Sequence, residues 1–326
     1  MTTPNTVEGV LVQWGDRLFY PSNRSTTSRT PSLSSLPLQQ RAHALRQRIH
    51  ATVVRRAPQV MAKVTGGGRG MAAIAAHLRY IAKGGRLPFE DDRGVTRDGK
   101  EALRAVVDQW RLGGSRIPEI SERREAFNIM LSMPAGTQPQ LVLSAAREFA
   151  KAELANHRYV MVLHTHQANP HVHLSVRAEG RDGKRLNPRK EDLRRWRETF
   201  AERLRGWGIE AEASSQATRG SRHRNARVWA RKTEQPRVQH PAKGEPLPSG
   251  IRKHALQTWV EITRALAASP DPSDRKLAQS INQYLGRMPV VQALARERAR
   301  QRKLPGMDQS PLMPSPLQRR GPEMER

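Results

Sequence analysis

Between residues 57 and 218 the apolar positions of the chain switch repeatedly between two periods. Spacings of three and four residues predict helices, and strict alternation predicts strands that are buried on one face. The expected strands are residues 60–64, 127–131, 159–166, 171–178 and 209–214, and the expected helices are 70–83, 141–154 and 189–205. Together these elements predict an α+β fold in which helices pack on one face of an antiparallel sheet.

The segments on either side of this region have weaker patterns and are expected to be flexible, basic extensions. A short hairpin is expected at residues 9–20, and residues 38–56 are expected to form an exposed helix or an extended arm. The C-terminal part is rich in proline, with one helical unit expected at 251–302. The expected domains are therefore a basic, Ser/Thr-rich N-terminal extension (1–56), a folded domain (57–218) and a basic, Pro-rich, partly helical C-terminal region (219–326).

The charge of the chain indicates a polyanionic partner. The sequence has 57 Lys and Arg against 30 Asp and Glu, a formal net charge of +27. Basic side chains gain affinity for nucleic acid because they release counterions from its phosphates. The absence of cysteine excludes disulfides, thiolate metal sites and cysteine nucleophiles. No long apolar run or signal-peptide pattern is found, so a cytoplasmic protein without membrane insertion is expected.

Four of the eleven histidines lie close together, at His164, His166, His171 and His173. Side chains alternate between the two faces of a strand, so each His-x-His pair shares one face. A hairpin closed by residues 167–170 would place His166 opposite His171 and His164 opposite His173. A single such pair is usually a solvated polar face, but four imidazoles in phase predict a site for a divalent metal ion.

A metal ion on a basic protein suggests phosphoryl-transfer chemistry, because the ion polarises a phosphate oxygen. Tyr80 is a candidate nucleophile, since it lies on the side of its expected helix opposite the apolar stripe of Met71, Ile74, Leu78 and Ile81. On this pattern alone, an exposed aromatic side chain without a catalytic role is the simpler interpretation. His77, one helical turn earlier, is a second-rank candidate for a general base.

Four motifs follow one another in the expected domain. They are a Gly-rich turn leading into His77-Leu-Arg-Tyr80-Ile-Ala-Lys-Gly84, then Leu131-Ser-Met-Pro-Ala-Gly-Thr137, then Ala145-Ala-Arg-Glu-Phe-Ala150, and last Leu163-His-Thr-His-Gln-Ala-Asn-Pro-His-Val-His173. This series resembles the relaxase/mobilisation nuclease family of conjugative and mobilisable plasmids, within the HUH endonuclease superfamily. The resemblance is greatest to the branch that contains the agrobacterial T-DNA border endonuclease.

The resemblance implies an HUH-type two-layer fold, a reaction and a set of site residues. Tyr80 would be the nucleophile, and His164, His171 and His173 would hold a divalent metal ion, Mn²⁺ or Mg²⁺. The family nicks one DNA strand at an origin of transfer, keeps the 5′ end as a phosphotyrosine and leaves a free 3′-OH. The family usually has Asp where this chain has His166, which leaves three alternatives: His166 acts as the base, it is a fourth ligand, or the activity is weakened.

Basic residues near the proposed site are expected to contact DNA phosphates. The candidates are Arg69, Lys83, Arg86, Arg177, Arg185 and Arg189. The expected partners are single-stranded or supercoiled plasmid DNA at an origin of transfer, accessory relaxosome proteins and, through the basic tail, a type IV secretion coupling protein. Two other functions remain open, namely a rolling-circle replication initiator and a non-catalytic basic DNA-binding component of a transfer complex.

Overall fold

Six strands pair into an antiparallel sheet in the computed structural model, which describes residues 6–19, 36–220 and 250–303. The strands are β1 (Met61–Gly68), β2 (Phe89–Asp91), β3 (Thr96–Arg97), β4 (Ala126–Ser132), β5 (His157–His164) and β6 (His171–Gly180). Their order in the sheet is β1-β4-β6-β5-β2-β3, so β1 lies at one edge and β6 near the centre. The expected α+β class and antiparallel sheet are confirmed.

One face of the sheet, called here the core face, packs against α5 (Pro139–Glu153) and α6 (Lys190–Gly206). Alternation along β4 and β6 places Ile129 and Leu174 on this face, and both are fully buried. These contacts remove a large apolar area from water, which is the main favourable contribution to folding.

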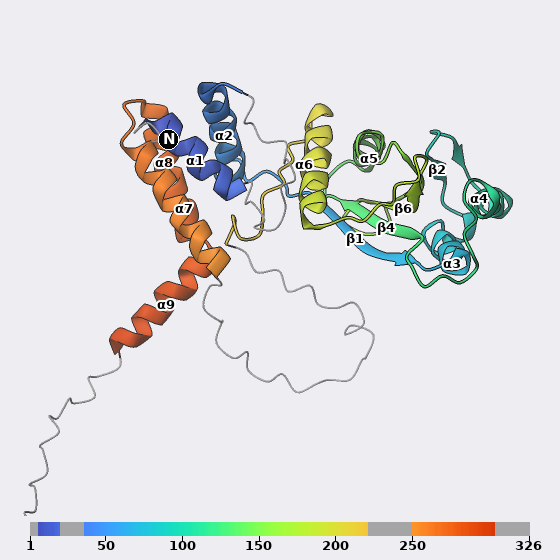
Figure 1. Ribbon diagram of the computed structural model, residues 1–326. Helices are drawn as coiled ribbons and strands as arrows, with labels where there is room; N and C mark the ends of the chain where they lie inside the picture. Colours follow the sequence, from blue (N-terminus) through green and yellow to red (C-terminus); the bar gives the residue numbers. More distant parts are fainter. Residues whose placement is uncertain (1–5, 20–35, 221–249, 304–326) are drawn as a thin grey trace, which may run out of the picture.

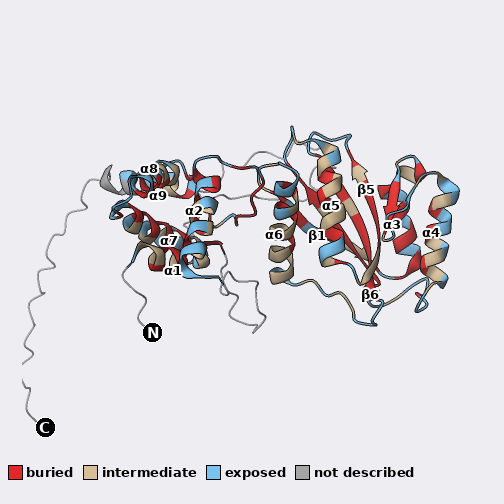
Figure 2. Cartoon of the chain, turned by 90° about the horizontal axis from the view of Figure 1, so that it is seen from above, coloured by how far each residue is buried: buried red, intermediate tan, exposed pale blue. Residues whose placement is uncertain are grey.

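The opposite face, called here the histidine face, is partly covered by α3 (Met71–Ile81) and α4 (Lys100–Leu112). The apolar stripe of α3 is buried as expected, and it packs with α4 over Val160 and Val162 of β5. Figure 2 shows the sheet between α5 and α6 on one side and α3 and α4 on the other. The helices therefore lie on both faces, not on one face as expected, because β2 and α4 extend the apolar surface of the histidine face.

The expected strand at residues 209–214 is not part of the sheet. This segment makes a single parallel bridge, between Gln59 and Glu212, with Val60 N–H donating to the Glu212 carbonyl at 2.9 Å. The chain then turns away, and Arg219 donates hydrogen bonds to the Ser214 side chain and carbonyl. The segment therefore has the alternating apolar pattern of a strand, but it lacks the row of backbone hydrogen bonds that would make it part of the sheet.

The described parts of the two extensions pack together into a helical cluster (Figure 1). Its helices are α1 (Val7–Phe19), α2 (Leu38–Val53), α7 (Gly250–Ala267) and α8 (Pro272–Gly286), and α9 (Pro289–Lys303) leads away from it. Leu45, Ile49 and Trp259 are completely buried in this cluster. The described helices are therefore an ordered unit with its own core, which the expectation of flexible extensions did not include.

The hairpin expected at residues 9–20 is wrong, because this segment is the helix α1. Leu11 and Leu18 are buried seven residues apart, which is two helical turns, and they face α2 and α7. A Cβ atom at Gly15 would lie 2.9 Å from Leu45, so the glycine allows α1 and α2 to approach closely. The helical unit expected at 251–302 is confirmed as α7, α8 and α9.

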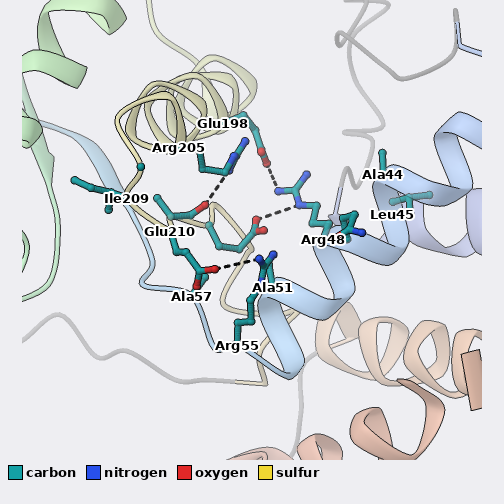
Figure 3. A pocket seen from close by; sticks show the side chains of 14 residues that line it. Ala44, Leu45, Arg48, Ala51, Arg55, Ala57, Glu198, Arg205, Ile209 and Glu210 are labelled. Atoms are coloured by element: carbon teal, nitrogen blue, oxygen red, sulfur yellow. Dashed lines mark hydrogen bonds and ion pairs between the residues drawn. The ribbon is translucent and has the colours of Figure 1, made fainter. Parts of the chain in front are cut away.

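Arg48 of α2 joins the helical cluster to the sheet domain (Figure 3). Its guanidinium lies 2.5 Å from Glu198 of α6 and 3.1 Å from Glu212, beside a cavity of about 440 Å³. Burial raises the pKa of Glu198 above its ordinary value, and the Arg48 charge opposes this shift. Removing Arg48 would leave the buried Glu212 carboxylate and the partly exposed Glu198 carboxylate without this cation.

None of the helices in the described ranges is long and apolar enough to cross a lipid bilayer.

Candidate metal centre and nucleophile

The hairpin of β5 and β6 pairs His164 with His171 and Val162 with His173. The expected pairing was therefore wrong by two residues, because β5 ends at His164 and the connection extends over 165–170. The Pro170 carbonyl fixes this longer connection by accepting hydrogen bonds from the Met133 N–H at 3.1 Å and from the Ser132 hydroxyl at 3.3 Å. A shift of two residues keeps each side chain on its face, so the three strand histidines still point to the same side.

Three imidazoles converge on the histidine face. His164, His171 and His173 each offer a ring nitrogen, and these atoms lie within 4.8 Å of one another. The ring centroids of His164 and His173 are 4.7 Å apart, and those of His171 and His173 are 5.0 Å apart. His166 is exposed in the connection, with its ring 5.1 Å from that of His164, and does not join this group of three.

Main-chain carbonyls orient two of these rings. His164 Nε2 donates to the Ile81 carbonyl at 2.6 Å, and His171 Nδ1 donates to the Asn169 carbonyl at 2.9 Å. Each bond leaves the other ring nitrogen without its proton and free to bind a cation, as in known metal sites where a second hydrogen bond fixes the ligating tautomer. The Nδ1 atom of His173 is buried and has no hydrogen-bond partner among the described residues.

Burial favours the neutral form of two of the three imidazoles. Burial, followed by the charges of neighbouring His164 and His171, lowers the pKa of His173 to about 3. Burial also lowers the pKa of His164. Neutral imidazole is the form that binds a metal ion, so the donor set, its convergence and its buried unpaired nitrogen all fit a first-row divalent cation.

Tyr80 lies at the end of α3 and is 73% exposed, as its position opposite the apolar stripe predicts. The rings of Tyr80 and His77 stack with a centroid distance of 6.4 Å. His77 Nε2 is buried without a hydrogen-bond partner in the described part of the chain, and burial lowers the pKa of this histidine. Because Ile81 follows Tyr80, the hydrogen bond from His164 attaches the tyrosine helix to the histidine group.

Two lysines flank the histidine group. Lys83 has a positive φ of 48° in the turn after α3, and its charge is among the causes that lower the pKa of His164. Lys63 is exposed on the edge strand β1, and its charge contributes in the same way at His173. Sequence reasoning missed Lys63, because the alternation of its strand does not say which strand pairs with it.

The expected DNA-binding residues do not form one surface. Arg69, Arg86 and Arg189 are exposed. Arg177 is only 4% exposed, and its guanidinium donates to the Gly113 carbonyl at 2.7 Å and to Ser115. Arg177 therefore holds the segment after α4 against the sheet, and its assignment to an exposed DNA surface is corrected.

Arg185 also has partners within the protein. It forms ion pairs with Glu125 at 3.1 Å and with Glu179 at 3.6 Å. Because Glu125 also binds Arg123 at 2.8 Å, this carboxylate is surrounded by cations, and its pKa lies below the ordinary value despite burial.

Residues 86–209 match a family model described as "Relaxase: MobA/VirD2-like, nuclease domain". The matched range contains all four histidines of the β5–β6 hairpin, whereas Tyr80 and β1 precede it. No curated protein matches the chain significantly.

Proposed function

The chain carries the nuclease domain of the MobA/VirD2-like relaxase family, and we propose that it nicks one DNA strand at an origin of transfer through a 5′-phosphotyrosyl intermediate. The observation that carries this proposal is the 2.6 Å hydrogen bond between His164 and the end of the helix that bears Tyr80. It brings a solvent-exposed phenol and a convergent histidine group to the same side of the sheet. The family match supports DNA nicking. Cleavage at an origin of transfer and the phosphotyrosyl intermediate are proposed in addition.

In the proposed reaction, the Tyr80 Oη attacks the scissile phosphorus. A bond forms between the phenolic oxygen and phosphorus, and the bond from phosphorus to the 3′ oxygen breaks. The phenolic proton passes to a base, and the leaving 3′ oxygen takes up a proton to become a hydroxyl. The phosphotyrosyl ester conserves the energy of the diester, so the strand can later be rejoined.

His164, His171 and His173 are the residues that would hold a divalent ion, Mn²⁺ or Mg²⁺. Such an ion, when bound, polarises a phosphate oxygen and stabilises the charge that develops on it. The proposal assigns the three imidazoles to this role because they converge within ligand range and because main-chain carbonyls orient His164 and His171.

His166 is proposed as the group that accepts the proton of Tyr80. It is exposed at the mouth of the hairpin beside His164, so a substrate can reach it. Tyrosine has an ordinary pKa near 10 and needs a base or a nearby cation to react at neutral pH. His77 is the alternative base, because its ring stacks on Tyr80 and its Nε2 has no partner among the described residues.

The substrate is proposed to be single-stranded or supercoiled plasmid DNA. The net charge of +27 and the exposed Arg69 and Arg86 support this partner. Lys83, beside the histidine group, is proposed to contact a phosphate close to the cleaved one. Accessory relaxosome proteins and a secretion coupling protein are proposed as further partners in the cytoplasm, from the family and from the basic C-terminal region.

A covalent-adduct assay tests the proposal. Labelled single-stranded oligonucleotides that tile the replicon encoding this protein are incubated with the chain and Mn²⁺, and the products are separated on a denaturing gel. We expect one oligonucleotide to give an adduct with the wild type and none with Tyr80→Phe. Binding without an adduct in any metal would instead support the non-catalytic DNA-binding component, and hydrolytic release of the strand would support a replication initiator.

A further inference from the structure

The edge strand β1 presents an exposed row of side chains on the histidine face. Met61 and Lys63 are exposed at alternate positions of the strand, before its register shifts at Thr65, so both point to the same side. Met61 is 40% exposed, and Lys63 and Thr65 are also exposed. α3 packs against the Gly68 end of β1 and over Val160 and Val162 of β5, whereas Met61, Lys63 and Thr65 stay exposed, so a substrate can reach this row.

The register of the sheet aligns Lys63 with the histidine group. Lys63 pairs with Met130 of β4, and Met130 pairs in turn with His173 of β6. Directly paired residues share a face, so Lys63 and His173 lie on the same side of the sheet, two strands apart. Two strand spacings amount to about 10 Å. A lysine side chain spans about 6 Å, so the Lys63 ammonium group can reach a phosphate bound at the histidine group without contacting the imidazoles.

The local charges leave Lys63 without an evident structural role. No carboxylate of the described residues forms an ion pair with it. A metal ion held by the histidine group would repel the Lys63 ammonium group across this distance, and an anion bound between the two cations would be attracted to both.

We propose that Lys63 binds a non-bridging oxygen of the scissile phosphate from the β1 side and stabilises the negative charge that grows on it during attack. The inference rests on the proposed function, because the anion is the phosphodiester that Tyr80 would attack. Lys83 lies two residues after Ile81, whose carbonyl binds His164 of β5, so the neighbouring phosphate that it is proposed to contact lies on the side of the histidine group away from β1. The ammonium group keeps its protons throughout and acts by charge and hydrogen bonding alone.

A pair of substrates that differ only in the charge of the scissile phosphate tests this role. The oligonucleotide that forms the adduct is compared with the same sequence carrying a methylphosphonate in place of the scissile phosphodiester, which removes the negative charge. We expect Lys63→Met to slow single-turnover adduct formation on the phosphodiester by about 100-fold, as for other groups that stabilise transition-state charge. On the methylphosphonate the variant and the wild type should differ by less than about 3-fold, and Lys63→Arg should recover part of the rate.

Binding measured in EDTA gives a second readout that is independent of cleavage. One lost phosphate contact should lower the slope of log K against log salt by about 0.7 for Lys63→Met. The matched control is Lys184→Met, which removes the same charge from a side chain that is 88% exposed on the turn after β6. The control should keep the wild-type cleavage rate.

Three results separate the two proposals. A wild-type cleavage rate in Lys63→Met would overturn the role of Lys63, and so would an equal loss of rate on both substrates. Failure of the wild type to form any adduct would instead overturn the proposed function.

Discussion

The Nε2 atom of His164 lies 2.6 Å from the carbonyl oxygen of Ile81, the residue that follows Tyr80. A member of the histidine group is thus bonded to the last turn of the helix that carries the proposed nucleophile. The tyrosine itself is 73% exposed, so its backbone is fixed while its ring is free to meet a substrate. Catalysis by positioning needs this combination, because a misplacement of about 1 Å can cost a factor of 100 in rate.

Replacing the Tyr80 hydroxyl should separate chemistry from binding. Tyr80→Phe removes the attacking oxygen without changing charge, and the exposed site makes a change in stability above about 0.5 kcal/mol unexpected. We expect no covalent adduct, with DNA affinity within a few fold of the wild type, measured by denaturing gel and fluorescence anisotropy. An adduct that persists in this variant would show that another residue attacks.

The donor set predicts a preference among metals. Three imidazole nitrogens are borderline-soft ligands, whereas Mg²⁺ prefers oxygen and releases its water reluctantly. Mn²⁺ should therefore support cleavage at a lower concentration than Mg²⁺, as a titration of each metal in the adduct assay will show. His171→Ala and His173→Ala should abolish cleavage in both metals, and retention of full activity by either variant would contradict the three-histidine site.

The exchange His166→Asp distinguishes a base from a ligand. His166 is exposed and outside the group of three, so a carboxylate there should leave metal affinity intact and hold or raise the rate of cleavage. Isothermal calorimetry with Mn²⁺ and single-turnover cleavage measure the two quantities on the same variant. A large loss of metal affinity would show that His166 is a necessary fourth ligand.

The neutral histidines predict that the metal-free protein loses stability in mild acid. The pKa of His173 is lowered to about 3, while an unfolded histidine binds a proton below about 6.5. Unfolding therefore takes up protons between these two pH values. The contribution of His173 to the free energy of unfolding is complete well above pH 6.5 and falls progressively towards pH 3. Between pH 7.5 and 5.5 this one residue should contribute a loss of about 1 kcal/mol.

Denaturant unfolding in EDTA at the two pH values measures this loss. His173→Asn should reduce the pH dependence, whereas His254→Asn, at an exposed position of α7, should not change it. An unchanged pH dependence in His173→Asn would show that this histidine is not held neutral in the folded protein.

Substitution of two arginines expected to contact DNA should have different effects, one on the stability of the protein and the other on DNA binding. Arg177→Gln removes a buried donor from the Gly113 and Ser115 carbonyls and should lower the free energy of unfolding by about 2–4 kcal/mol. Arg86→Gln, at an exposed site, should leave stability unchanged and lower the salt slope of DNA binding by about 0.7. Urea unfolding measures stability, and salt titrations of DNA binding measure the slope. An Arg177→Gln variant with wild-type stability and a reduced salt slope would show that Arg177 contacts DNA after all.

The sheet and its main helices could be predicted because their periodicity is local. Four of the five expected strands and all three expected helices of the domain are present, each within a few residues of its predicted ends. The short strands β2 and β3 were missed, since two or three residues do not establish a period. The strand expected at 209–214 failed because alternation cannot tell whether a neighbouring strand is available.

The three residues of the histidine group were predicted from the sequence, but the pairing of their two strands was not. The face shared by His171 and His173 depends only on alternation, whereas the partner of each residue depends on the length of the connection. That length is fixed by tertiary hydrogen bonds to the Pro170 carbonyl, which no local pattern encodes. Lys63 was missed for the same reason, because only the pairing of β1 with β4 brings it in line with His173.

The packing of α1 and α2 against α7 and α8 affects how the chain folds during its synthesis on the ribosome. Arg46 and Asp274, which bind each other at 2.8 Å, are separated by 228 positions, so a ribosome adding 5–20 residues per second needs roughly 10 to 45 seconds between them. During this interval α1 and α2 can pack against each other, but their apolar side chains that face α7 and α8 have no partner and need a chaperone or transient contacts to shield them. The sheet is synthesised within the same interval and can fold first, so the last helices to leave the ribosome are those that cover the first.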